Sequence, residues 1–325
     1  MDVGARWGIG WPFNNLSHSE LSIMLVEPDP EEAILLETFY KKKHFEAKVF
    51  QTALWSRNEN LVLNLTNSPG CSSVFTPNMS LLNRFPKSDR FSISKKIEIK
   101  TDTIDNLFSC DKIKEIDFLK IDVQGAELEI LKGGKSFLKN NLIGIEIEVE
   151  FLEMYEGQPL FSEIDLFIRN ELGLELWDLG KTYWKYNHRG RKRIPVKGKL
   201  AFGDALYFRP IEKITEWLTN FETEFAKGKI EVLIQTALLY GYVDYAYALL
   251  EDDKISQYFS NSEIKLINDK IQKTGLGINL NFKGSGYFYL FFQTIANLFK
   301  PVEKDFATRS ELQLGAKRKF YFWNY

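Results

Sequence analysis

Residues suited to ligand binding lie in two turns near the start of the chain. The first turn combines a carboxylate with small residues in the pattern D-x-G-A-x-x-G, formed by Asp2, Gly4, Ala5 and Gly8. Glycines let a backbone approach a ligand closely, and the carboxylate can accept its hydrogen bonds. Glu27 follows the next apolar run, where a doubly wound α/β fold binds ribose hydroxyls. Together the two turns indicate a nucleotide-like ligand, although Glu27 alone could be a solvated turn acid.

Asp122 is a candidate catalytic acid or base. It ends the apolar run 116–122, and the carboxyl ends of parallel strands form the ligand crevice of open α/β sheets. A structural alternative is that Asp122 caps the following helix, whose first turn already carries Glu127 and Glu129. We favour the functional interpretation.

Three further acids lie within a predicted strand, GIEIEVE at 144–150. Strands inside a parallel sheet are normally apolar on both faces, so these acids need an explanation. We expect Glu148 and Glu150 to lie at the active-site end of the strand. Glu146 is expected to meet buried partners or to lie beneath a helix.

The elements that would position these residues form an α/β pattern. Short apolar runs alternate with amphipathic ones from residue 21 onward, which predicts a parallel sheet covered by helices on both faces. The strands predicted at 173–180 and 204–210 lack an intervening helix, so we expect them to pair as an antiparallel hairpin. One strand is predicted over 47–56 and one helix over 127–138.

The character of the chain changes after Pro210. The remaining residues show helical periodicity, interrupted at Gly228 and Gly241, which predicts a helical hairpin or small bundle. We therefore expect two parts, 1–210 and a mainly helical extension over 211–325. The aromatic run 287–299 favours a packed helix, with a membrane-surface or partner-binding helix as the alternative.

The chain resembles the FkbM family of S-adenosylmethionine-dependent methyltransferases in the segments DVGARWG, VEPDPEEA, IDFLKIDVQGAELEILKGG, IEVEFLEMYEGQPLFSEIDLFI and LELWDLG. The resemblance covers roughly residues 2–210, and FLKIDVQGAELEILKG is its most specific part. It implies a Rossmann-like class I methyltransferase fold, bound S-adenosylmethionine, and O-methylation of a hydroxyl on a sugar, glycan or polyketide-like acceptor.

The resemblance also implies roles for individual residues. Asp2, Gly4, Ala5 and Gly8 would hold the methionine part of the cofactor, and Glu27 the ribose hydroxyls. The segment 51–54, with Ala53, would lie along the adenine. The antiparallel hairpin expected at the end of the sheet agrees with this family, and the first turn lacks the G-x-G-x-x-G spacing of a dinucleotide site.

One departure from the family is the very start. Family members enter the DVGA turn through an apolar strand, of which this chain supplies almost nothing. A start codon assigned too late, a natural fragment and a shortened first strand that still docks would each explain this, and we favour the first.

Methyl transfer to oxygen is an in-line displacement that needs a base only to make the hydroxyl nucleophilic. Asp122 is the first candidate for this base and Glu148 the second. Alternatively the carboxylates bind a divalent cation such as magnesium, which lowers the pKa of the hydroxyl.

A basic stretch, 181–199, is the loop of the predicted hairpin. It holds eight Lys or Arg and no acid. A solvated charge run is the ordinary interpretation, but Trp184 could stack on a sugar ring while Arg189, Arg191 and Arg193 bind phosphate. We therefore expect an acidic or phosphorylated acceptor on the cofactor side of the sheet.

Composition restricts the remaining possibilities. In 325 residues, 42 Lys and Arg oppose 44 Asp and Glu, so the net charge of -2 does not favour nucleic acid. Cys71 and Cys110 match no metal or redox spacing, which fits a reducing compartment, and we expect the cytoplasm. No apolar run approaches the roughly 20 residues that span a bilayer.

The rival functions are a nicotinamide-dependent oxidoreductase and a non-catalytic cofactor-binding protein.

Overall fold

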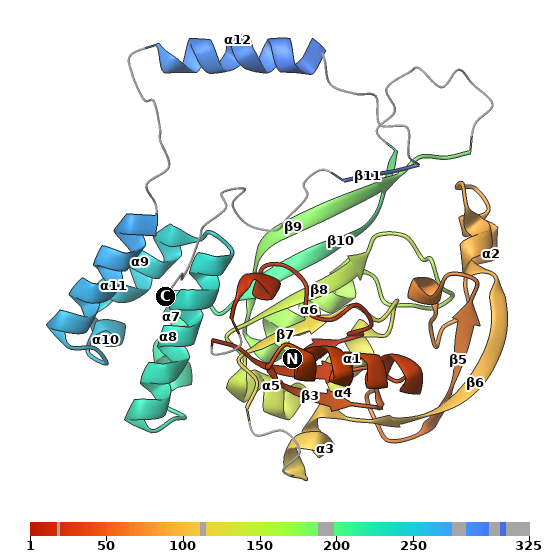
Figure 1. The fold of residues 1–325 in the computed structure, drawn as a ribbon, viewed down its shortest axis with the longest axis horizontal. Coiled ribbons are helices and arrows are strands. Elements are labelled where there is room, and N and C mark those ends of the chain that lie inside the picture. Colours follow the sequence, from red (N-terminus) through yellow and green to blue (C-terminus); the bar gives the residue numbers. More distant parts are fainter. Residues whose placement is uncertain (18–19, 111–114, 188–197, 275–283, 299–305, 310–325) are drawn as a thin grey trace.

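The computed structural model describes residues 1–325 except 18–19, 111–114, 188–197, 275–283, 299–305 and 310–325. Eight strands of the described residues form the main sheet (Figure 1). In spatial order the strands are β11 (Ala307–Arg309), β9 (Glu175–Trp184), β10 (Lys199–Phe208), β8 (Gly144–Glu150), β7 (Phe118–Ile121), β1 (Asp2–Val3), β2 (Ser22–Val26) and β3 (Glu46–Phe50). The neighbouring strands β3, β2, β1, β7 and β8 are parallel, and β10 runs antiparallel between β8 and β9. The predicted Rossmann-like sheet with its terminal antiparallel hairpin is confirmed.

A smaller sheet lies beside the main one and contains β4 (Ala53–Leu54), β6 (Ile93–Asp102) and β5 (Asn60–Thr66). The single strand predicted over 47–56 is therefore wrong, because the chain turns after β3 and changes sheets. The Thr52 backbone N–H donates to the Phe50 carbonyl in this turn, and β4 pairs with the end of β6.

The helices on one face of the main sheet lie between residues 104 and 172. They are α3 (Ile104–Ser109), α4 (Glu127–Gly133), α5 (Lys135–Asn141) and α6 (Phe161–Phe167), the last continued by a π-helical turn over Ile168–Leu172. Their apolar residues form one core with Leu119, Ile145 and Ile147 of the sheet. The helix predicted over 127–138 is divided in two at Gly134, which lies between α4 and α5.

The opposite face is covered by α1 and by the C-terminal helices. The first of these, α1 (Pro30–Lys42), packs on β2 through Leu36 and Tyr40. The C-terminal helices are α7 (Ile211–Leu218), α8 (Thr223–Leu239), α9 (Val243–Glu251), α10 (Asp253–Ser256) and α11 (Asn261–Thr274). Short helices are α2 (Met79–Leu82) and the 3-10 turns Phe13–Asn15, Pro69–Cys71 and Ser88–Phe91. Helices therefore cover both faces, as predicted.

The C-terminal helices share a hydrophobic core with the sheet. Phe118 of β7 and Phe208 of β10 belong to the same buried cluster as Leu233 of α8. The Tyr240 hydroxyl, just after α8, donates a 2.6 Å hydrogen bond to Glu146 Oε2. This contact confirms that Glu146 has a buried partner. Gly228 lies within α8 rather than breaking it, whereas Gly241 adopts a positive φ of 88° in the turn before α9.

A last helix, α12 (Ser285–Leu298), contains most of the aromatic run. In Figure 1 it stands apart from the other described elements. Its large apolar side chains from Tyr287 to Phe292 are exposed, so the expectation of a packed helix is wrong. No helix in the described part of the chain has the length and apolar character needed to cross a membrane.

Candidate active site

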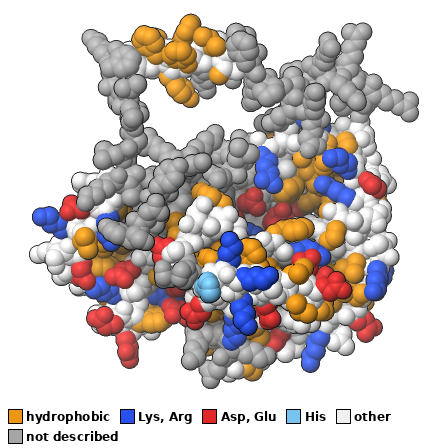
Figure 2. Space-filling model, in the orientation of Figure 1, with side chains coloured by type: hydrophobic (Ala, Val, Ile, Leu, Met, Phe, Trp, Pro, Cys, Tyr) orange, Lys and Arg blue, Asp and Glu red, His pale blue; other side chains and the backbone are white. Residues whose placement is uncertain are grey.

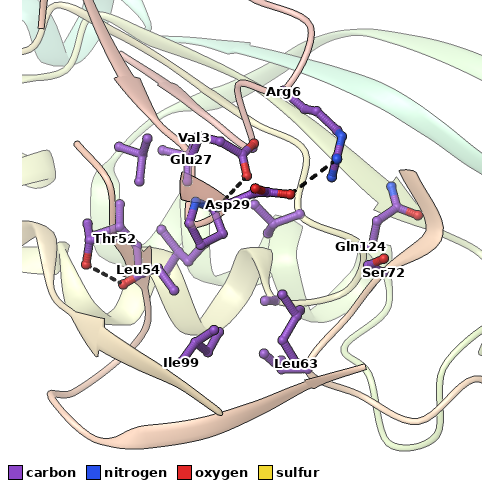
Figure 3. Close-up of a pocket in the computed structure, with 18 of the residues that line it drawn as sticks. Val3, Arg6, Glu27, Asp29, Thr52, Leu54, Leu63, Ser72, Ile99 and Gln124 are labelled. Atoms are coloured by element: carbon purple, nitrogen blue, oxygen red, sulfur yellow. Dashed lines mark hydrogen bonds and ion pairs between the residues drawn. The ribbon is translucent and has the colours of Figure 1, made fainter. Parts of the chain in front are cut away.

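A pocket of about 230 Å³ opens where β1, β2 and β7 end (Figure 3). Each of these strands contributes one predicted site residue to its wall. Gly4 follows β1, Glu27 follows β2 and Asp122 follows β7. The carboxyl ends of parallel strands converge at one edge of a sheet, so the topology brings Asp122 to Gly4 and Glu27, which lie far from it in the sequence.

The glycine turn owes its form to close packing. Gly4 has a φ of 83°, and a Cβ placed on it would lie 2.0 Å from the Asp122 carbonyl oxygen. The Gly4 and Ala5 N–H groups both donate to the Val26 carbonyl, at 3.1 and 3.2 Å. Gly8 has a φ of 73°, and its Cβ would lie 2.6 Å from the Tyr40 hydroxyl oxygen. Gly4 lines the pocket. Ala5 and Gly8 belong to the same turn but are not among the described residues that line it.

Asp2 lies beneath this turn instead of in the described pocket wall. It is buried, and its Oδ1 lies 3.9 Å from Lys120 Nζ on the neighbouring strand. Burial raises the pKa of the Asp2 carboxyl, and the nearby ammonium group only partly opposes this. Burial would lower the pKa of Lys120, but the surrounding carboxylates, led by Asp2, raise it instead. The pair is therefore an internal contact between β1 and β7.

Glu27 is buried at the pocket wall, which contradicts the solvated-acid alternative. Its Oε1 accepts a 2.9 Å hydrogen bond from the Asp29 backbone N–H, so the carboxylate is held in a fixed direction. Burial raises the pKa of Glu27. Arg6 lies nearby in Figure 3 and pairs with Asp29 at 3.4 Å and with Glu32 at 3.1 Å.

The opposite wall is apolar. Ala53 and Leu54 of β4 contribute to it, and further residues come from the smaller sheet: Leu61, Leu63, Leu65, Ile97 and Ile99. Such a surface suits a flat heteroaromatic ring, which gains free energy when it leaves water.

Gln124 links Asp122 to the buried acids behind the pocket. Its side-chain Nε2 donates to Asp122 Oδ1 at 3.0 Å and to Glu148 Oε2 at 2.7 Å. Helix α4 begins after Ala126, and no side chain of the described residues caps it, so Asp122 is not the predicted cap. Asp122 lines the pocket directly, whereas Glu148 lies behind Gln124.

Gln124 itself is held from several directions. Its Oε1 accepts from the Tyr155 hydroxyl at 3.2 Å, and its carbonyl oxygen accepts from Ser73 Oγ at 2.7 Å. Its φ of 60° is uncommon for a residue with a side chain, and these contacts stabilise it. Sequence reasoning missed Gln124 and Tyr155. The only signal was a polar residue next to Gly125 in a strand-to-helix turn.

Three buried acids gather behind Gln124. One oxygen from each of Glu127, Glu148 and Glu150 lies within 4.8 Å of the others. Burial, followed by the neighbouring acids, raises the pKa of Glu148 and Glu150 well above the usual value, and burial raises that of Glu127 to about 7. For Glu150, burial and the neighbouring acids outweigh a hydrogen bond from the Gln158 side chain, which lowers the pKa. The cluster could share protons or hold a cation.

The basic stretch is only partly described, because Arg189, Arg191 and Arg193 lie outside the described residues. Trp184 is 3% exposed, and its ring packs between Phe85 and Phe202, with centroids 5.4 and 5.9 Å away. The guanidinium carbon of Arg90 lies 4.8 Å from the same ring. The prediction that Trp184 stacks on an acceptor is wrong, since neighbouring side chains already cover the indole.

The chain is similar to known methyltransferases. The family model described as "Methyltransferase FkbM domain" matches residues 2–176. The chain is 29% identical over 129 residues to the 2-O-methyltransferase NoeI of Sinorhizobium fredii (strain NBRC 101917 / NGR234), covering 38% of this chain and 53% of NoeI. It therefore spans about half the length of this curated relative.

A solved structure, methyltransferase FkbM from Methylobacillus flagellatus KT, overlaps with a TM-score of 0.32 at 14% identity, covering 57% of this chain and 36% of that one. The family model alone spans more than half of the present sequence. The chain belongs to the family of methyltransferases that contain an FkbM domain.

Proposed function

We propose that this protein transfers a methyl group from S-adenosylmethionine to a hydroxyl oxygen of a sugar or glycan. The observation that carries the proposal is that Glu27 and Asp122, at the ends of two strands, line the same pocket. Family membership supports the methyl donor, and the description of NoeI as a 2-O-methyltransferase supports oxygen as the acceptor atom.

The polar and apolar groups that line the pocket fit S-adenosylmethionine. Glu27 would accept hydrogen bonds from the ribose hydroxyls, and its bond from Asp29 N–H orients it for this. The apolar wall with Ala53 and Leu54 would cover the adenine, and the turn at Gly4 would face the methionine part. When bound, S-adenosylmethionine supplies an electrophilic methyl group on a positively charged sulfur.

Asp122 is the proposed base. Asp122 belongs to the pocket wall, and its carboxylate would accept the proton of an acceptor hydroxyl, which makes the oxygen a better nucleophile. Gln124 fixes the direction of this carboxylate through the 3.0 Å hydrogen bond. Glu148 is the second candidate, and it would act from behind Gln124, either as a proton acceptor itself or by holding the amide in place.

A divalent cation would be an alternative way of lowering the pKa of the hydroxyl. The close approach of Glu127, Glu148 and Glu150 is the feature that would provide its ligands. Direct proton transfer to Asp122 needs no such ion, so EDTA should leave the rate unchanged. A rate that EDTA abolishes and magnesium restores would replace the direct mechanism by the metal-assisted one.

The acceptor is proposed to carry an acidic or phosphorylated group. Support comes from the sequence alone, in which Arg189, Arg191 and Arg193 belong to a stretch without acids. Replacing these three arginines by serine should raise the acceptor KM and leave the Kd for S-adenosylmethionine unchanged. The wild-type acceptor KM should also rise with salt, because the Debye length is only about 8 Å at physiological ionic strength.

Two measurements test the main proposal. In a thermal-shift titration, S-adenosylhomocysteine should raise Tm whereas NAD should not, which separates a methyltransferase from a nicotinamide-dependent enzyme. Transfer of a tritiated methyl group from S-adenosylmethionine to a panel of sugar nucleotides and oligosaccharides should give a product stable to mild base, as an ether is. A base-labile product would identify a carboxylate methyl ester and contradict the hydroxyl acceptor.

A further inference from the structure

Helix α12 presents a large apolar surface that the described part of the fold leaves uncovered. Tyr287 is 81% exposed, Tyr289 65% and Phe292 63%. In Figure 2, hydrophobic side chains gather at the place that α12 occupies in Figure 1. The exposed apolar residues of α12 are Tyr287, Phe288, Tyr289, Leu290, Phe291, Phe292 and Ile295. Apolar patches of this kind mark sites of interaction with proteins or membranes.

The apolar residues surround the helix instead of forming a stripe. Residues 287–292 are consecutive, and successive helical residues are rotated by about 100° from one another. Their side chains therefore point in every direction around the axis. The polar residues Gln293, Thr294 and Asn297 follow this run in the sequence. A protein groove covers one face of a helix and is matched by an apolar stripe, whereas a stretch that is apolar around its circumference suits a surrounding apolar medium.

The length of α12 and the charges beside it indicate how deeply it would insert into a lipid bilayer and which lipids would favour it. Fourteen residues extend about 21 Å at 1.5 Å per residue, too short for a hydrocarbon core of about 30 Å. No charged residue lies within 285–298, and in the sequence Lys283 and Lys300 flank the helix. Lysines at both ends complement anionic headgroups, and tyrosine suits the boundary between headgroups and hydrocarbon.

We propose that α12 inserts into one leaflet of a bilayer that carries anionic lipids and attaches the protein to that surface without spanning it. In the chain α12 is followed by β11, where Ala307 pairs with Trp184 at the end of β9. The paired ends of β9 and β10 extend beyond β8, on the side of the sheet where the parallel strands end and the pocket opens. The attachment is independent of the proposed methyl transfer.

Flotation of the full chain with lipid vesicles tests the proposal. Wild-type protein should float with vesicles of phosphatidylcholine and phosphatidylglycerol, and less with phosphatidylcholine alone. The double variant Phe288→Glu/Phe291→Glu places two charges one turn apart and should lower the bound fraction at least about tenfold, because buried charge at a membrane is costly.

A matched control comes from α1. Ile34 and Leu35 are each 61% exposed, so Ile34→Glu/Leu35→Glu makes an equal change of charge on another helix. This control should float like the wild type, and both variants should keep the wild-type Tm. Absence of wild-type binding to both vesicle types would overturn the proposal, as would equal binding by the α12 variant.

A second copy of the chain is the other possible occupant. Light scattering in the absence of lipid should give the same mass for the wild type and for Phe288→Glu/Phe291→Glu. If the wild type forms an oligomer that the variant does not, a protein covers α12 and the membrane proposal is wrong. None of these readouts uses the methyl donor or an acceptor, so they remain informative if the proposed activity fails.

Discussion

The side-chain amide of Gln124 donates a 2.7 Å hydrogen bond to Glu148 Oε2. The same nitrogen donates to Asp122 Oδ1 at 3.0 Å, so one amide connects the pocket wall to the acids buried behind it. Because both bonds start from one nitrogen, Gln124 holds the two carboxylates in a fixed position relative to each other.

Replacing Gln124 by Ala should lower kcat about tenfold and change the Kd for S-adenosylhomocysteine less than about twofold, because positioning and general-base effects are realised in the transition state. Without the amide, the Asp122 carboxylate loses the contact that fixes its direction in the pocket. Initial-rate assays and calorimetric titration with S-adenosylhomocysteine would measure the two effects. An unchanged kcat with a weakened Kd would make Gln124 a binding residue instead.

The variant Asp122→Asn should lower kcat on the order of a hundredfold, since general-base catalysis contributes about this much or more. Cofactor affinity should remain, because the amide preserves the shape of the pocket wall. Isothermal titration calorimetry and single-turnover methylation would separate the two effects. A large fall in Tm without a specific loss of turnover would assign Asp122 a structural role.

Glu27→Gln should weaken S-adenosylmethionine binding about tenfold, which corresponds to about 1.4 kcal/mol. The amide oxygen can still accept from Asp29 N–H, so the turn should persist while the charge that favours the ribose hydroxyls is lost. Calorimetric titration would report the change. The matched control is Glu37→Gln, an exposed acid on α1 that should bind like the wild type. Equal affinities in both variants would exclude Glu27 from the cofactor site.

Glu146 should make the protein less stable as the pH rises. Burial raises its pKa from 4.5 to about 7, so the folded state retains a proton that the unfolded state has lost. Stability then falls as the pH rises from about 4.5 to about 7. Glu146→Gln should remove this loss and stabilise the protein at pH 8 by up to about 3 kcal/mol, with little effect at pH 4.5.

Urea unfolding at pH 4.5 and 8 would measure this difference, with the exposed Glu98→Gln as the control. If Glu146→Gln and wild type lose stability in parallel with pH, another buried acid is responsible.

Much of the fold could be predicted because its signals are local. Apolar periodicity and turn residues located the strands, and the absence of a helix between the last two strands of the sheet predicted their antiparallel pairing. The division between β3 and β4 could not be seen, because the pairing of Ala53 with Thr101 depends on a strand far along the chain.

The site was predicted less completely for a similar reason. Glu27 and Asp122 could be predicted because each follows an apolar run that the sequence marks as a strand. The role of Gln124 depends on contacts with Ser73 and Tyr155, which only the folded chain brings together. The predicted role of Trp184 was wrong because aromatic residues beside arginines occur both on binding surfaces and in buried clusters. In the folded chain its ring belongs to a buried cluster.

The part of the chain that the family model matches does not contain the whole of its own hydrophobic core. The family match ends at residue 176, two residues into β9, yet β10 lies between β8 and β9 and has to be present before β9 can join the sheet. Phe118, inside the matched region, is covered by helices that follow it by a hundred residues. The segment that the family model matches therefore lacks β10 and the helices that cover one face of its sheet. Its hydrophobic core is completed by residues that lie outside the match.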